Sequence, residues 1–277
     1  MPAPITFKGK LLLQEFVVFG LVQVLGLWAA LSLFSRTEFA EIQVTTSLWQ
    51  FIVSFAVATV LMIIALRLIR GGLFFKTLFF LVNFLGAEII FNVYLPVAVA
   101  VALAVLIVLV RSVVPRVWSH NLTIILGLAG VGAAFGLSLP VAAVLLILFL
   151  LSIYDYIAVY KTDYMVTMFR GLMQRGAIFA AVLPVKMRGW FVDLNKVKPG
   201  NEFVFLGTGD MVLPLILSAS AVSYSFVSAV FSLGGSLFGL VVLHILFTSQ
   251  KRRAPMPALP PLALFAALGF VISLLIK

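Results

Sequence analysis

Two aspartates of this 277-residue sequence lie inside long apolar runs. Asp155 stands near the end of the run 140–160, and Asp210 stands near the start of the run 203–224. If such runs cross a membrane, a carboxylate inside one costs about 3 kcal/mol even on scales derived from membrane insertion. The first question is therefore whether the two aspartates meet in one site.

Two carboxylates in close contact have a chemistry of their own. Desolvation and mutual repulsion prevent both from ionising easily, so the pair shares a proton and titrates as a unit. The ionised member can take a proton from water while the protonated member donates to a carbonyl oxygen, which gives a gem-diol and then a broken peptide bond. This hydrolysis needs no covalent enzyme intermediate, no metal and no other cofactor.

The composition places both aspartates in a membrane. Hydrophobic residues make up 64% of the chain and charged residues 10%, and the mean hydropathy is +1.24. The apolar runs are continuous rather than alternating, which favours helices over a transmembrane barrel. Cysteine is absent, which excludes thiol catalysis, disulfides and cysteine-ligated metals. In a membrane protein, the formal charge of +10 indicates basic loops that set the orientation of the helices, rather than a surface that binds nucleic acid.

Nine apolar runs are each close to the roughly 20 residues that span a bilayer. With the N-terminus in the cytoplasm, every Lys and Arg except Arg36 and Lys277 falls on the cytoplasmic side, a strong positive-inside signal. We therefore expect an all-α, integral, multi-pass protein with nine transmembrane helices, its N-terminus cytoplasmic and its C-terminus outside, in the cell membrane if it is prokaryotic. The expected helices cover residues 11–34, 48–69, 72–92, 95–115, 119–138, 140–160, 203–224, 226–248 and 258–276.

The sequence shows no repeat and no linker, so we expect one membrane domain over residues 1–277. The first six helices occupy 1–160 and the last three occupy 203–277. Between them lies a cytoplasmic loop, 161–202. Its apolar middle, 165–183, could form an interfacial helix, but a solvated basic loop is the favoured interpretation.

The expected topology brings the two aspartates to nearly one depth. Asp155 would lie roughly 8 Å and Asp210 roughly 10 Å from the cytoplasmic edge, on consecutive antiparallel helices. Gly207 and Gly209 remove side chains that would hold those helices apart. The proline-rich stretch 255–261 predicts irregular backbone at the same depth, which is tolerated only inside protein or beside a water-filled cavity.

Three short motifs lie in this order on the expected sixth, seventh and ninth helices: Tyr154-Asp155, Gly207-Thr-Gly-Asp210 and Pro257-Ala-Leu259. They resemble the YD, GxGD and PAL motifs of the presenilin and signal peptide peptidase family of intramembrane aspartyl proteases. The resemblance is close over about 140–277 and fits a compact microbial presenilin-like homologue. It implies that Asp155 and Asp210 are the catalytic pair. It also implies that the remaining motif residues shape the active site or bind substrate: Tyr154, Gly207, Thr208, Gly209, Pro257, Ala258 and Leu259.

The resemblance also implies the partners. The substrates would be transmembrane segments of other membrane proteins, unwound locally for cleavage, and an extended substrate could pair with backbone near the seventh helix by strand addition. The expected cytoplasmic N-terminus matches presenilins, since signal peptide peptidases are inverted. The lipid bilayer is the other partner, nucleic acid is not one, and a homo-oligomer stays open.

Two alternatives use the same residues. Prepilin peptidases also carry a GxGD aspartate, but they lack the pattern of YD and PAL found here. A proton-coupled transporter or leak channel could use an intramembrane carboxylate pair and a broken helix, although no inverted repeat is visible. A zinc protease is unsupported because no His-Glu-x-x-His occurs.

The other polar residues within the runs are expected to be structural, with Glu15 snorkelling toward the interface. These are Glu15, Glu88, His120 and His244. The two Gly-x-x-x-Gly pairs, over 132–136 and 235–239, predict close helix packing.

Overall fold

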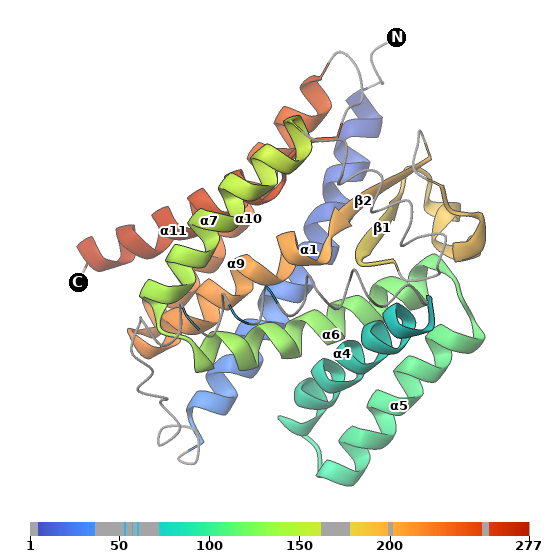
Figure 1. The fold of residues 1–277 in the computed structure, drawn as a ribbon, viewed down its shortest axis with the longest axis horizontal. Coiled ribbons are helices and arrows are strands. Elements are labelled where there is room, and N and C mark those ends of the chain that lie inside the picture. Colours follow the sequence, from blue (N-terminus) through green and yellow to red (C-terminus); the bar gives the residue numbers. More distant parts are fainter. Residues whose placement is uncertain are drawn as a thin grey trace.

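The computed structural model describes residues 5–36, 53, 57, 60, 72–161, 178–198, 202–250 and 255–276. Over these residues the chain is a bundle of apolar helices with one small sheet (Figure 1). Five helices are long and apolar enough to cross a membrane, and three further apolar helices are shorter. This architecture is that of a helical, polytopic membrane protein.

The five long helices are α1 (Ile5–Phe34), α4 (Gly72–Asn92), α6 (Val117–Ser138), α7 (Val141–Tyr160) and α10 (Phe226–Ser249). The three shorter ones are α5 (Val97–Val113), α9 (Thr208–Ser220) and α11 (Leu259–Leu275). Short 3-10 turns are η1 (Met187–Phe191), η2 (Leu194–Lys196) and η3 (Ala221–Ser223). The strands are β1 (Ala180–Pro184) and β2 (Phe203–Gly207).

Local sequence signals explain where several helices begin. Pro96 and Pro140 stand immediately before α5 and α7, where a missing N–H and a fixed φ suit the start of a helix. Ser225 caps α10, because its hydroxyl accepts a hydrogen bond from the N–H of Ser228 at 3.0 Å. Most of the predicted helix boundaries agree with the structure. The predicted helix 72–92 coincides with α4, and the predictions for α5, α6, α7, α10 and α11 are within two residues at each end.

The predicted helix over 48–69 lies outside the described residues. The count of nine helices and the orientation of the two chain ends therefore stay predictions. The first helix is confirmed as one long element, although it begins at Ile5 rather than at residue 11.

The start of the predicted seventh helix is wrong. Residues 203–207 form β2, which pairs antiparallel with β1, and α9 begins only at Thr208. Over Ala180–Pro184 the same pairing overturns both interpretations of the loop, because every residue of β1 is buried and none is helical, whereas the basic side chains of 186–198 are exposed, as expected of a solvated basic loop. The Phe-Val-Phe-Leu stretch of β2 has the aromatic and β-branched residues that suit a half-buried strand, and an apolar run of that length does not by itself distinguish strand from helix.

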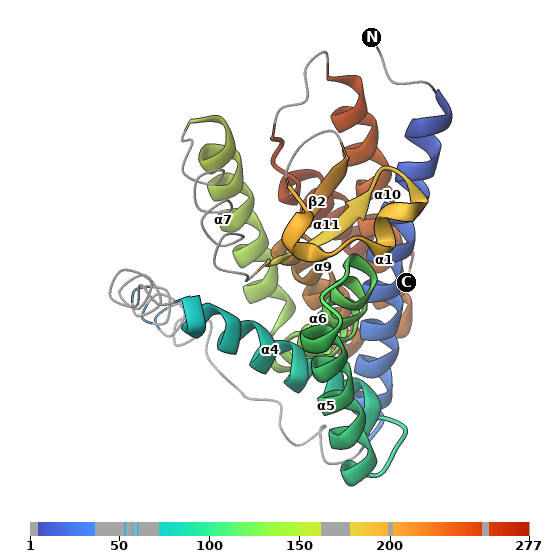
Figure 2. The same cartoon turned by 90° about the vertical axis from the view of Figure 1, so that its right-hand side faces the viewer.

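Helix α6 lies at the centre of the bundle and contacts α1, α4, α5, α9 and β1. Helix α11 contacts α7, α9 and α10. In Figure 2 the sheet covers one end of this arrangement, and α7 stands to one side of α9 and α11. The two helices that carry the aspartates, α7 and α9, are therefore in direct contact with each other and with the helix that follows the proline-rich stretch.

Glycines set the closest of these helix contacts, as the two Gly-x-x-x-Gly pairs predict. A Cβ at Gly132 would lie 2.5 Å from the side chain of Leu215, which joins α6 to α9. A Cβ at Gly235 would collide with the backbone carbonyl of Phe265, which joins α10 to α11. Both pairs therefore act in packing within this chain.

The prediction that Glu15 snorkels to the interface is wrong. Glu15 and His244 are both buried, and Nδ1 of His244 lies 2.6 Å from Oε2 of Glu15. The pair joins α1 to α10 across the bundle. A buried carboxylate needs such a partner, and the sequence could not indicate it because the two residues are far apart along the chain.

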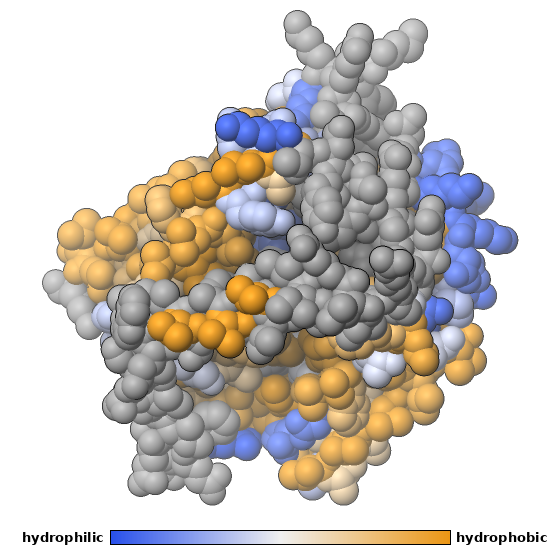
Figure 3. All heavy atoms as spheres, in the orientation of Figure 1, coloured by the Kyte–Doolittle hydropathy of each residue, from blue (hydrophilic) through white to orange (hydrophobic). Residues whose placement is uncertain are grey.

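The surface divides into apolar and polar regions. Figure 3 shows apolar side chains over much of the helical surface, and hydrophilic side chains gathered at the side where η1 and η2 lie in Figure 1. Large apolar side chains on the helices, such as Phe149 and Phe238, are more than half exposed. This pattern suits helices that face lipid. The exposed basic side chains of the segment between the strands are Lys186, Arg188, Lys196 and Lys198.

Two adjacent glycines of α10 give a test of the packing. We expect Gly235→Ala to destabilise the protein by about 1–3 kcal/mol because the added methyl group must displace the backbone of α11. Gly234→Ala should be neutral or slightly stabilising, since nothing lies within 4 Å of a Cβ there. Thermal unfolding of both variants in the same detergent checks this. Equal midpoints would contradict the close contact.

Candidate active site

The carboxylate of Asp155 is bound by the start of α11. The backbone N–H of Leu259 donates to Oδ2 of Asp155 over 3.2 Å, and the N–H of Ala258 also donates to this carboxylate. The first N–H groups of a helix have no partner within the helix and attract negative charge. The segment Pro-Ala-Leu, 257–259, therefore supplies an anion-binding helix end to an aspartate of another helix.

The stretch that leads to this helix is only partly irregular. Residues 255–258 are not helical, as predicted, and Pro257 is buried. Pro260 lies within the first turn of α11, where proline is compatible with the helix. The irregular backbone thus ends at the start of α11, where the N–H of Leu259 donates to Asp155.

The carboxylate of Asp210 lies in the first turn of α9, where it faces the N-cap residue Gly207. The N–H of Gly207 donates to this carboxylate, in the manner of the acidic side chain in a capping box. A Cβ added at Gly207 would lie 2.7 Å from Oδ2 of Asp210. A glycine at this position is therefore required for the observed place of the carboxylate.

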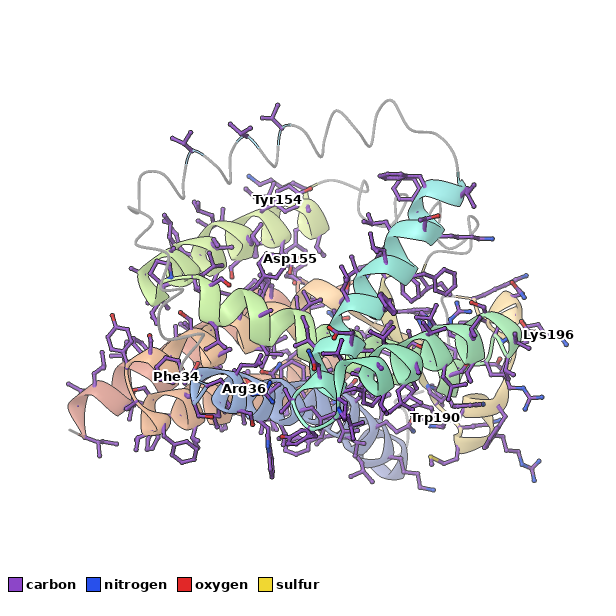
Figure 4. The ribbon with its side chains drawn as sticks, turned by 90° about the horizontal axis from the view of Figure 1, so that it is seen from below. Phe34, Arg36, Tyr154, Asp155, Trp190 and Lys196 are labelled. Atoms are coloured by element: carbon purple, nitrogen blue, oxygen red, sulfur yellow. The ribbon has the colours of Figure 1, made fainter. Side chains whose placement is uncertain are left out.

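The structure brings the two aspartates together. Helix α7, which carries Asp155, is in contact with α9, which carries Asp210. Figure 4 shows Asp155 on the side of α7 that faces the bundle, with Tyr154 on the other side. The two carboxylates thus lie on contacting helices, each of them beside the backbone at the start of a helix.

The small sheet holds the start of α9. Gly207 is paired with Ala180 of β1, and the next residue, Thr208, donates from both its N–H and its hydroxyl to the carbonyl of Phe179, over 3.2 and 3.3 Å. Residues 207–210 therefore form a direct transition from strand to helix without a loop. The position of Asp210 depends on the position of β1.

One neighbour of the site was missed by the sequence analysis. Gln23 of α1 is fully buried, and its Nε2 donates to the carbonyl of Met211 over 2.7 Å. This bond fixes the turn of α9 that follows Asp210. The available signal was an amide side chain inside an apolar helix, because such a group is costly unless it is hydrogen-bonded.

Two motif residues, Tyr154 and Gly209, are exposed. The side chain of Tyr154 is 61% exposed. A Cβ at Gly209 would meet nothing within 4 Å, and one at Gly207 would meet only Asp210, so neither glycine is seen to provide the expected close approach of α7 and α9. Where the structure describes the chain, it also brings together no group of three or more His, Cys, Asp or Glu that could hold a metal ion.

Comparison with known proteins agrees with this geometry. The family model described as "Signal-peptide peptidase, presenilin aspartyl protease" matches residues 16–277, so the chain belongs to that family. A search of curated proteins gives no match.

Two solved structures of similar fold are both described as a presenilin family intramembrane aspartate protease. The one in space group C222 is 21% identical, covers 96% of this chain and 99% of its own, and has a TM-score of 0.66. The one in space group P2 is 23% identical, covers 95% and 97%, and has a TM-score of 0.64. These two likenesses show the fold. As a member of the family that the model identifies, the chain is a hydrolase, an intramembrane aspartyl protease, and the transporter and prepilin-peptidase alternatives are not favoured.

The contact between Gly207 and Asp210 gives a test. We expect Gly207→Ala to lower the rate of peptide cleavage by roughly 10- to 100-fold, because the methyl group displaces a carboxylate that must be accurately placed. Gly209→Ala, two residues further on, should cause a smaller loss. Cleavage of a transmembrane peptide by purified protein measures both. A larger loss for Gly209→Ala would contradict the assigned role of Gly207.

Proposed function

We propose that Asp155 and Asp210 form the catalytic dyad that hydrolyses peptide bonds within transmembrane segments of other membrane proteins. The observations that support this most directly are the contact between the two helices that carry these carboxylates, α7 and α9, and the hydrogen bond from the start of α11 to Asp155. Their proximity makes it costly for both to be ionised, so the pair retains one proton over a working range of pH.

The proposed reaction follows from that shared proton. The ionised carboxylate takes a proton from a water molecule, and the water oxygen attacks the carbonyl carbon of the substrate peptide bond. The protonated carboxylate donates its proton to the carbonyl oxygen, which gives a neutral gem-diol. Transfer of a proton to the amide nitrogen then breaks the C–N bond, and both products leave as free chain ends. No metal or cofactor takes part.

The other motif residues are proposed to bind or orient the substrate. Residues 257–259 hold Asp155 through backbone N–H groups, while Gly207 and Thr208 hold the turn that carries Asp210. Gly209 and Tyr154 are exposed, which suits contact with a substrate helix. The substrate must be extended at the cleaved bond. Because β1 begins and β2 ends close to the turn that carries Asp210, the substrate is proposed to pair with this sheet.

The proposed setting is the membrane topology expected from the loop charges. It has nine transmembrane helices, a cytoplasmic N-terminus and an outer C-terminus in a cell membrane. The exposed basic segment between β1 and β2 would then lie on the cytoplasmic side, where the positive-inside rule places such residues.

Removal of either carboxylate tests the dyad. We expect Asp155→Asn and Asp210→Asn each to lower cleavage of a transmembrane peptide by at least about 10³-fold, because one carboxylate alone cannot both activate water and protonate the carbonyl. Both variants should keep the thermal midpoint of the wild type within a few degrees, since Asn has the same size as Asp.

Glu88→Gln is the matched control for this test, because Glu88 is a half-buried acid of an apolar helix away from the pair. It should cleave at the wild-type rate. Turnover retained in either aspartate variant would rule out a dyad. If the wild-type protein leaves the peptide intact and solute flux depends on both aspartates, the transporter alternative would be favoured over the protease.

A further inference from the structure

Helix α6 carries a group of buried polar side chains in its first two turns. Ser119, His120, Asn121 and Thr123 are all at most 1% exposed. Ser119 and Thr123 bind backbone of their own neighbourhood. His120 and Asn121 instead reach across to β1, about 60 residues further along the chain.

Asn121 binds both backbone polar groups of one strand residue. Its Nδ2 donates to the carbonyl of Val182 over 2.7 Å, and its Oδ1 accepts from the N–H of Val182 over 2.9 Å. This is the double hydrogen bond that a residue of a neighbouring antiparallel strand would make. The amide of Asn121 therefore takes the place of a third strand on the edge of β1 that faces away from β2.

His120 extends this edge by one more bond. Its Nδ1 accepts from Nε of Arg111 over 3.1 Å, so the ring proton is on Nε2. Nε2 then donates to the carbonyl of Ala180 over 3.0 Å. Ala180 and Val182 are two residues apart and so present their polar groups to the same edge of the strand.

The contacts continue from β1 to the proposed catalytic aspartate. Val182 is paired with Phe205 and Ala180 with Gly207. Phe179, which precedes β1, accepts both hydrogen bonds from Thr208. A displacement of β1 would therefore move the first turn of α9, and Asp210 with it.

We propose that Asn121 is a positioning residue for the protease reaction: it holds β1, and through β1 the strand-to-helix turn that places Asp210. This inference rests on the proposed catalytic role of Asp210. Asn121 does not touch the reacting atoms and acts only through Val182. Its loss would leave the N–H and the carbonyl of a fully buried residue without their partner, so β1 would shift to find others.

The test compares three variants with the wild type. Asn121→Ala removes both hydrogen bonds. Asn121→Asp has the same size and keeps the acceptor for the N–H of Val182, but it places a carboxylate oxygen against the carbonyl. Asn83→Ala is the matched control: Asn83 is also buried and also donates to a carbonyl over 2.7 Å, but that carbonyl belongs to Phe79 of its own helix α4.

The measurements are kcat and KM for a transmembrane peptide, the thermal midpoint, and hydrogen exchange of the segment 178–185. We expect both Asn121 variants to lose roughly 10- to 100-fold in kcat, with a smaller change in KM, since a misplaced carboxylate affects the chemical step. Exchange should rise in 178–185 in both. Asn83→Ala should keep its kcat within about twofold, whatever happens to its thermal midpoint.

A purely structural role for Asn121 would lower the thermal midpoint and leave kcat per folded molecule unchanged, which would overturn the proposal. A wild-type kcat in Asn121→Asp would also overturn it, because the donor to Val182 would then be unnecessary. Asp210→Asn is measured beside these variants. If it stays active, the proposed function fails; if it is inactive while Asn121→Ala equals Asn83→Ala, only the present inference fails.

Discussion

The hydrogen bonds from the start of α11 to Asp155 are the interaction on which the site depends. In lipid, a carboxylate and a free helix end are each costly, because neither finds water. Placed against each other, the N–H groups of Ala258 and Leu259 and the carboxylate of Asp155 satisfy both needs at once. The same contact holds α7 against α11, and α9 packs against both. The packing of three helices and the placement of one aspartate thus have a common cause.

The same rule explains the other long-range hydrogen bonds of the bundle. Gln23 binds the backbone of α9, Asn121 binds the backbone of β1, and Glu15 binds His244. Apolar side chains pack at many similar distances, whereas a buried polar group needs a partner at hydrogen-bonding distance and in the right direction. Such bonds therefore specify how the helices and the sheet are placed around the aspartates, while glycines such as Gly235 determine how closely they approach.

The sequence predicted the parts that depend on local signals. The apolar runs predicted most of the helices, and the motifs around Asp155 and Pro257 named residues of α7 and α11 that the structure brings into contact. The two strands were missed because a short apolar stretch such as Phe203–Gly207 fits a strand or a helix equally well. The partners of Glu15, Gln23 and Asn121 were missed for a different reason: each lies more than 50 residues away, and no local pattern encodes it.

The direct change from β2 to α9 also affects the distance that the chain spans before Asp210. An extended residue advances about 3.3 Å and a helical residue about 1.5 Å. Five residues of strand can therefore cover about 16 Å, where a helix of the same length would cover about 8 Å. The five residues Phe203–Gly207 therefore span a longer distance than the same residues would in a helix. From Thr208 the chain continues as the helix that carries Asp210. An extended backbone that faced only lipid would leave its N–H and carbonyl groups without hydrogen-bond partners. Strand β1 supplies those partners to β2.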